Sequence, residues 1–257
     1  MRLNSLSARS AAAALFLFSA ACRGGDAPPD GQPPGREREL ATQALEAGAA
    51  VMQDVTPVRQ IDVYLAGFHP MKEHPGEQME SHHYCNQVNE DFAQCVLFDG
   101  NTATANLHGI EFIISEKLYE SLPADERPFW HPHNYEILSG QLVGPGLPDA
   151  AEEAFMRRKM NSYGKTWHVW RTGVHGQARD PLPFGPAMLA WSFNRDGEAL
   201  PGMVEERDRQ MGIDTAEKRR QRAGLAELAR PQDGVDTLRD AFPGAAGAPH
   251  GVVGREP

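Results

Sequence analysis

The sequence has 257 residues, of which 35 are acidic and 25 are lysine or arginine, so its formal net charge is −10 at neutral pH. Such a chain is poorly suited to binding nucleic acid or an anionic lipid surface, because both are bound through clustered lysine and arginine. Residues 39–229 are long enough for one domain with a sizeable hydrophobic core.

The N-terminus predicts export. An apolar run, Ala11–Ala21, follows Arg2 and Arg9 and ends directly before Cys22. The run is too short to span a bilayer and is typical of a signal peptide, here residues 1–21. Small residues before a cysteine resemble a bacterial lipoprotein signal, which implies acylation of Cys22 and a membrane-anchored protein in the bacterial cell envelope, facing the periplasm or the exterior. The alternative is an ordinary signal peptide cleaved near the end of the run.

Composition divides the remaining chain into three parts. Residues 22–38 are rich in Gly, Pro and Asp and predict a flexible tether. Residues 39–229 form the expected domain. Residues 230–257 show little periodicity and predict a disordered tail.

Within the domain, apolar periodicity alternates between helical and strand-like spacing. The expected elements are a helix over 39–54, a strand over 61–68, a β-hairpin over 94–115, a short helix over 116–122 capped by Ser115, a strand over 135–144, a helix from an N-cap at Asp149 to a C-cap at Gly164, strands over 165–173 and 187–193, and a helix over 214–229 capped by Asp214 or Thr215. This pattern predicts an α+β fold, a single domain with a mainly antiparallel sheet and flanking helices.

Common catalytic signatures give no support for a particular reaction. The sequence has no GxSxG, HExxH or GxGxxG pattern. The Gly-Lys-Thr at residues 164–166 lacks the glycine that a phosphate-binding loop needs five residues earlier, where Lys159 stands. No catalytic residue can therefore be assigned, and whether the protein is an enzyme stays open.

Histidine clusters are the most informative feature. They include "SHHYC", with His82 and His83, "WHPH", with His131 and His133, and "TWHVW", with His168. Pro132 favours an extended backbone, in which His131 and His133 project from the same face. Imidazole is the commonest metal ligand among side chains, so these five histidines predict a site for a divalent transition metal such as zinc.

Two interpretations of these histidines remain open. In the first, they bind a metal, and Glu136 supports a ligand through a hydrogen bond. In the second, they are buried histidines hydrogen-bonded to carboxylates such as Glu111 and Glu136.

The cysteines also have alternatives. Apart from Cys22, only Cys85 and Cys95 are present. In an exported protein a disulfide between them is expected. Otherwise Cys85 is a metal ligand or a nucleophile beside the neighbouring histidines.

Several long motifs carry a family resemblance. They are "SHHYCNQVNEDFAQCVLFDG", "GIEFIIS", "LPADERPFWHPHNYEILSGQLVGPGLP", "YGKTWHVW", "LPFGPAMLAWSF" and "ERDRQMGIDTAEKRRQR". Together they resemble the oil body-associated protein family, a domain of unknown function, over about residues 40–222. The resemblance implies association with a lipid surface and supplies no enzymatic activity.

The sequence thus leaves two functions in play. One is a lipid-anchored, noncatalytic binding or structural domain that is attached to a membrane through its acylated N-terminus and contacts lipid. The other is a metal-dependent hydrolase or oxidoreductase that uses the histidine cluster. The oligomeric state is not predicted.

Overall fold

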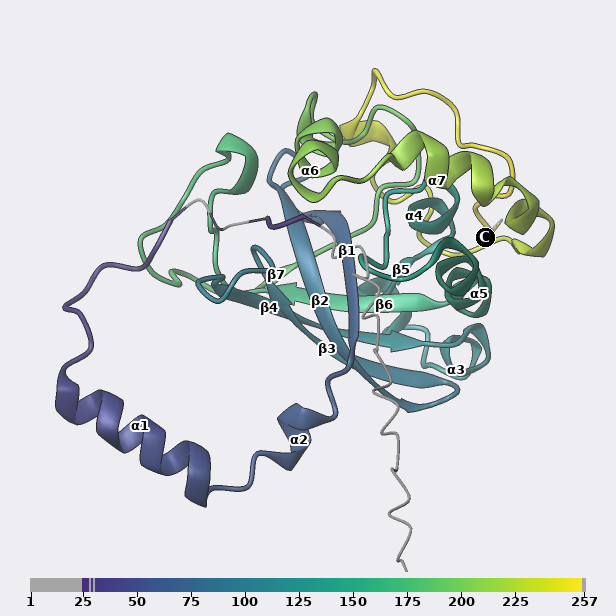
Figure 1. Cartoon of the computed structure of the whole chain (residues 1–257). Helices are drawn as coiled ribbons and strands as arrows, with labels where there is room; N and C mark the ends of the chain where they lie inside the picture. Colours follow the sequence, from purple (N-terminus) through teal and green to yellow (C-terminus); the bar gives the residue numbers. More distant parts are fainter. Residues whose placement is uncertain (1–24, 28, 30, 256–257) are drawn as a thin grey trace, which may run out of the picture.

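The computed structural model describes residues 25–27, 29 and 31–255. Its framework is one curled antiparallel sheet, with strand order β1-β2-β3-β4-β6-β5 and with β7 paired to β6 (Figure 1). The strands are β1 (Val63–Pro70), β2 (Gln78–Asn89), β3 (Phe92–Phe98), β4 (Leu107–Ile114), β5 (His131–Pro132), β6 (Tyr163–His168) and β7 (Met188–Leu189). The expected α+β class is confirmed.

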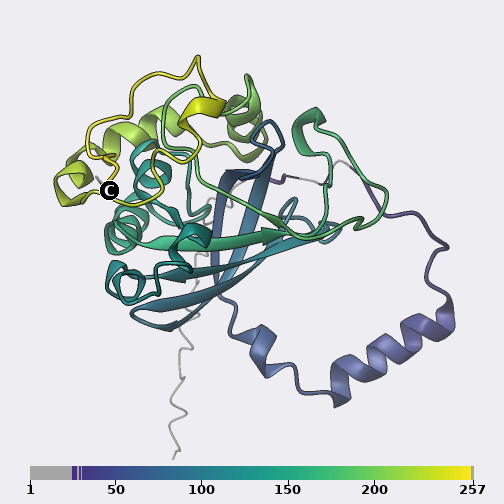
Figure 2. The same ribbon diagram turned by 180° about the vertical axis from the view of Figure 1, so that it is seen from behind.

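Most of the helices gather on one side of this sheet (Figures 1 and 2). The α-helices are α1 (Leu40–Met52), α2 (Thr56–Arg59), α3 (Glu116–Glu120), α4 (Asn134–Leu138), α5 (Asp149–Lys159), α6 (Met203–Met211) and α7 (Thr215–Gln221), and the 3-10 helices are η1 (Arg127–Phe129), η2 (Val174–Gly176), η3 (Ala223–Leu228) and η4 (Arg239–Ala241). By contrast, α1 and α2 stand away from the body on a long connection, and α1 has no buried residue.

The main hydrophobic core fills the space between the sheet and the helices. It joins Leu65 and Phe68 of β1 to Ile137 of α4, Met156 of α5 and Met203 of α6. Each strand places alternate residues on the two faces of the sheet. One face of β1 and β2 therefore looks into the covered interior, where the polar centre described below also lies.

A disulfide connects β2 to β3. Cys85 and Cys95 are opposite each other in the strand register and their Cα atoms lie 4.0 Å apart. The predicted disulfide is present, so neither cysteine is a free thiolate that could bind a metal or act as a nucleophile.

The strand expected over 135–144 is wrong. This segment begins with α4, whose five residues are all buried, and turns at Gly140, which has a φ of 81°. A short apolar run does not by itself distinguish a buried strand from a buried helix. Likewise α5 ends at Lys159, and the chain reverses through Asn161 with a φ of 67°, so Gly164 is a strand residue and not a helix cap.

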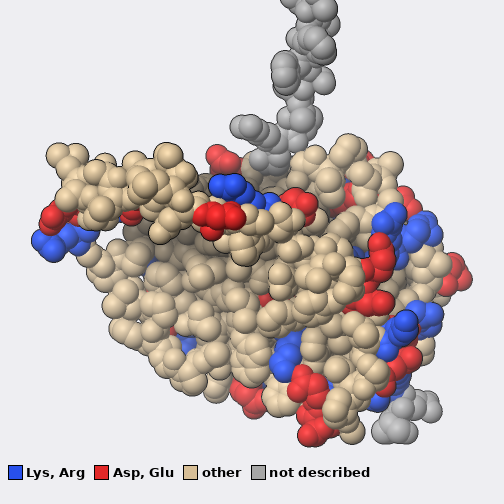
Figure 3. Space-filling view, turned by 90° about the horizontal axis from the view of Figure 1, so that it is seen from below, with Lys and Arg blue, Asp and Glu red and all other residues tan. Residues whose placement is uncertain are grey.

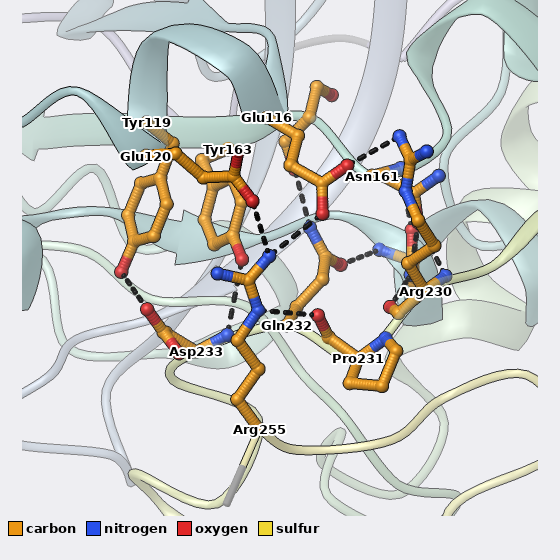
Figure 4. Close-up of polar contacts among 12 residues, drawn as sticks. Glu116, Tyr119, Glu120, Asn161, Tyr163, Arg230, Pro231, Gln232, Asp233 and Arg255 are labelled. Atoms are coloured by element: carbon orange, nitrogen blue, oxygen red, sulfur yellow. Dashed lines mark hydrogen bonds and ion pairs between the residues drawn. The ribbon is translucent and has the colours of Figure 1, made fainter. Parts of the chain in front are cut away.

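The C-terminal segment is also different from the prediction. Residues 230–255 pack on the body, with Gln232, Val235 and Val252 buried. Arg255 reaches Glu116 at 2.8 Å, and Arg230 forms an ion pair with the same carboxylate (Figure 4). The segment lacks periodicity because it docks irregularly, through separate buried side chains.

The described part of the tether also touches the domain. The amide of Ala27 donates to Asn101 Oδ1 at 2.7 Å, and Asn101 Nδ2 donates to the carbonyl of Gly25 at 2.9 Å. The predicted signal peptide and Cys22 lie outside the described residues. Acylation of Cys22 therefore stays a prediction.

Candidate metal centre

The register of the sheet aligns polar residues on its inner face. His83 of β2, Leu97 of β3, Gly109 of β4 and His168 of β6 form one row across four strands. Glu111 follows Gly109 by two positions in β4, so it lies on the same side of the sheet. Residues far apart in the chain therefore meet because the strands pair in this register.

Glu111 is the hub of the centre. Its Oε2 lies 2.9 Å from His83 Nε2, and its Oε1 lies 3.3 Å from His133 Nε2 and 3.5 Å from His131 Nε2. Burial by itself would raise the pKa of Glu111, but the imidazoles of His83, His131 and His133 outweigh this effect and hold the pKa well below its usual value. The carboxylate is therefore ionised in a closed interior.

The hydrogen bonds of Ser162 determine which ring nitrogen of His133 carries a hydrogen. Ser162 Oγ donates its single hydrogen to the carbonyl of Lys159 at 2.6 Å, and it lies 2.8 Å from His133 Nδ1. The serine must then accept from Nδ1–H, because a hydroxyl has one hydrogen. In a neutral imidazole this leaves a lone pair on Nε2, directed at Glu111 Oε1. Two acceptors that face each other need either a proton or a metal ion between them.

His69 and His131 complete the ring of imidazoles. The His69 ring centre is 5.2 Å from that of His83 and 5.5 Å from that of His131. Burial lowers the pKa of His69 well below its usual value and lowers the pKa of His131 to about 4. Both rings are consequently neutral at neutral pH, which is the form that binds a metal.

Three overlapping sets of donors could hold an ion. Their ligand atoms lie within 4.8 Å of one another, and the sets are His69, His83 and Glu111; His69, His131 and Glu136; and Glu111, His131 and His133. Bonds of about 2.0–2.1 Å in a tetrahedral site place ligand atoms about 3.4 Å apart. The cavity that His69, His83, Glu111, His133 and Glu136 help to line has a volume of about 20 Å³, enough for one water molecule or ion.

Several buried nitrogens in this region lack hydrogen-bond partners among the described residues. They include both ring nitrogens of His131 and Nδ1 of His83. Buried polar atoms are nearly always hydrogen-bonded in folded proteins. Unpartnered imidazole nitrogens around one ionised carboxylate fit a bound metal ion better than they fit hydrogen-bonded packing.

Gly164 makes room for the centre. It pairs with His131 in the sheet, and a Cβ at this position would lie 2.6 Å from Nε2 of both His131 and His133 and closer still to Glu111 Oε1. Any larger residue would occupy the space into which the three side chains converge.

His82 does not join this centre. Adjacent residues of a strand point to opposite faces, so His82 lies on the other side of the sheet from His83. There its Nδ1 is 2.6 Å from the hydroxyl of Tyr64, and its Nε2 is 3.0 Å from Glu80 Oε1. Glu80 also contacts His175 Nε2 at 2.5 Å.

Among the other predicted residues, His83, His131 and His133 come together as expected. His168 lies one step further out, with its Nε2 3.2 Å from His69 Nδ1. Glu136 reaches the centre from α4, and its Oε2 is 3.9 Å from His133 Nε2. Burial, followed by the negative charge of Glu111, raises the pKa of Glu136 well above its usual value.

Sequence reasoning missed two central residues. His69 is not among the residues that the sequence predicts for the site, and Glu111 is expected there only as a hydrogen-bond partner. Each had a signal in the sequence: Glu111 interrupts the apolar strand "GIEFIIS", and His69 directly follows the expected strand "IDVYLAGF". A charged or imidazole group in a buried strand needs a partner inside the fold.

Comparison with known proteins identifies the family. Residues 55–226 match the family described as protein of unknown function DUF1264. The sequence is 33% identical over 205 residues to oil body-associated protein 1B of Arabidopsis thaliana, which covers 80% of this chain and 82% of that protein. The chain belongs to the oil body-associated protein family.

Further members of the family match this chain to a similar extent. Oil body-associated protein 2B of Arabidopsis thaliana is 37% identical over 196 residues, covering 76% of this chain and 78% of that protein, and oil body-associated protein 2A of Zea mays is 36% identical over 204 residues, covering 79% of each. No solved structure matches.

These relatives overturn one prediction. They are plant proteins named for oil bodies. An apolar run before a cysteine, which led to a bacterial cell envelope, is a short and common pattern, and the location drawn from it is wrong. Among the described residues, no helix is long and apolar enough to cross a membrane.

Proposed function

We propose that this member of the oil body-associated protein family binds one divalent transition-metal ion in the centre around Glu111. The observation that carries the proposal is the pair of facing acceptors, His133 Nε2 and Glu111 Oε1, 3.3 Å apart in a closed interior. His69, His83 and His131 supply further ring nitrogens. A proton could bridge one such pair, but an ion can satisfy the whole ring of donors.

The donors restrict the choice of metal. Imidazole nitrogens with carboxylate oxygens suit zinc, iron, manganese, cobalt and nickel, whereas magnesium and calcium prefer oxygen ligands alone. The disulfide removes the thiolates that would favour copper(I) or an iron–sulfur cluster. Zinc remains a suitable ion, and more than four candidate donors also permit five- or six-coordinate iron or manganese.

We expect about one metal ion per chain when the purified full-length protein is measured by elemental analysis. Removing the ion with a chelator should lower the melting temperature, because a ligand present at 1,000 times its dissociation constant stabilises the folded state by about 4 kcal/mol. For a protein of this size that corresponds to about 8–16 °C.

Glu111→Gln should abolish metal binding, since it removes the charge shared by three histidines. Glu126→Gln, which changes a partly exposed acid paired with Lys165, is the matched control and should keep the ion. The proposal fails if folded wild-type protein, incubated with each of the metals named above, binds none of them.

A second proposed activity is contact with a neutral lipid surface. The names of the relatives suggest it, and α1 favours it: Leu40, Leu45, Val51 and Met52 of this helix are each at least 76% exposed. The face of the molecule seen from below also has few charged side chains in its middle (Figure 3). Because the chain carries a net charge of −10, an uncharged surface is favoured over an anionic one.

Flotation tests this second activity. Full-length protein carrying Cys22→Ser, which removes any acyl group, should float with triacylglycerol droplets coated in phosphatidylcholine. Leu45→Glu combined with Val51→Glu should reduce the floating fraction at least about fivefold, because two charges would have to enter the apolar layer. Thr42→Glu, on the polar side of α1, serves as the control. Equal flotation of all three proteins, or none of the parent protein, would contradict the proposal.

A further inference from the structure

A surface pocket adjoins the closed centre, and we call it the outer pocket. It has a volume of about 290 Å³ and lies between the β2–β3 turn, the end of β4 with the start of α3, and the end of α5. Gln87, Asp91, Lys117 and Arg158 are among the residues that line it.

The outer pocket and the central cavity share part of their lining. Ile113 and Lys159 line both the outer pocket and the central cavity. Ser162 lines the outer pocket as well, and its hydroxyl accepts the hydrogen bond from the candidate ligand His133. A molecule in the outer pocket would therefore contact side chains that also line the centre.

Lys159 is the part of this shared lining that can move. It is the last residue of α5, and its ammonium donates to Gln87 Oε1 at 2.5 Å. Among the residues that the structure describes, it is the only lysine or arginine that lines the central cavity. A lysine side chain has four rotatable carbon–carbon bonds, so breaking its contact with Gln87 would open a path that a branched apolar residue could not.

We propose that the outer pocket admits a small anionic ligand to the metal, and that Lys159 selects this ligand by its charge. The inference rests on the proposed metal site. A divalent ion and Lys159 together carry three positive charges, against two negative charges if Glu111 and Glu136 are both ionised, so the centre favours an anion. The charges of the outer pocket also favour an anion. Its basic residues outnumber its acidic ones: they are Lys117, Arg158, Lys159 and Arg230, against Glu90, Asp91 and Glu116.

Size restricts the ligand further. The central cavity of about 20 Å³ is filled by the metal ion itself, so a ligand of the ion can occupy only the space that the Lys159 side chain leaves, which is too small for a sugar, a nucleotide or a fatty acyl chain. The class that fits is an inorganic anion, or another anion of a few atoms, that reaches the metal from the outer pocket as Lys159 swings aside.

Azide titration of the cobalt(II)-loaded full chain tests the inference, with the visible absorption of the metal as the readout. Azide should change the spectrum of the wild-type protein. Lys159→Met should weaken azide binding at least about tenfold because the attracting charge is lost, and Lys159→Arg should stay within about threefold of wild type. Lys165→Met makes the same substitution at a lysine paired with Glu126 and should leave azide binding unchanged.

The outcomes separate the two proposals. If wild-type protein binds neither cobalt(II) nor any of the other metals named above, the proposed function fails. If it binds cobalt(II) but azide leaves the spectrum unaltered, or if Lys159→Met binds azide as wild type does, the outer pocket is not the entry route and the inference is overturned. Lys159→Gln, a second uncharged variant that can still bond to Gln87, should match Lys159→Met, and a wild-type affinity for azide would likewise overturn the inference.

Discussion

Gly164→Ala is expected to destroy the metal centre with the addition of one methyl group. The new Cβ would lie 2.6 Å from Nε2 of His131 and of His133, and closer still to Glu111 Oε1. The two rings and the carboxylate would have to move apart inside a packed interior. Overpacking of this kind costs about 1–3 kcal/mol in folding free energy, occasionally more, and here it also separates the donors.

The measurements are metal content and thermal unfolding. We expect the variant to lose the ion and to melt at least about 10 °C below the metal-loaded wild type, since the overpacking adds to the lost metal stabilisation. Gly224→Ala is the control, because a Cβ there meets nothing within 4 Å. Gly164 does not have a positive φ, so strain in the backbone would not explain the result. A variant with the metal content and melting temperature of wild type would show that the three side chains do not converge as described.

Arg222→Met is expected to destabilise the helical side of the domain by about 3–5 kcal/mol, the usual effect of removing one member of a buried ion pair. Arg222 is 1% exposed. Its Nη1 donates to the carbonyls of Ile137 at 3.1 Å and Leu142 at 2.6 Å, and its Nη2 lies 3.1 Å from Glu152 Oε1. One side chain thus connects α4, the turn after it and α5.

Urea unfolding measures this effect. Methionine retains much of the length and apolar volume of arginine, so the loss should come from two unsatisfied carbonyls and from Glu152, which keeps only Lys218 as a charged partner. Arg220→Met is the matched control: this arginine is largely exposed, pairs with Glu217, and should change stability by about 0.5 kcal/mol or less. A loss below about 1 kcal/mol for Arg222→Met would mean that the helices are held by apolar packing alone.

The sequence predicted local structure best where one pattern dominated. Ser115 and Asp214 cap α3 and α7 as expected, because a side-chain oxygen at the N-cap accepts a backbone amide whatever the rest of the fold does. The hairpin of β3 and β4 and the disulfide were also predicted, since both join residues close together in the chain. Errors came where a buried segment was short, as in α4, or irregular, as in the C-terminal segment.

For the candidate centre, the sequence determined which residue types were available and that neighbouring strand residues alternate between faces. It predicted that His82 and His83 lie on opposite faces of the sheet, but it did not determine which of the two faces the interior. Only the tertiary structure decided that, because the inner face is set by where the helices pack on the sheet. The pairing register of β2, β3, β4 and β6 then brings His83 and Glu111 together, and the chain reversal at Asn161 places Gly164 beside them. Donors from distant strands meet through long-range pairing, and no local periodicity encodes such contacts.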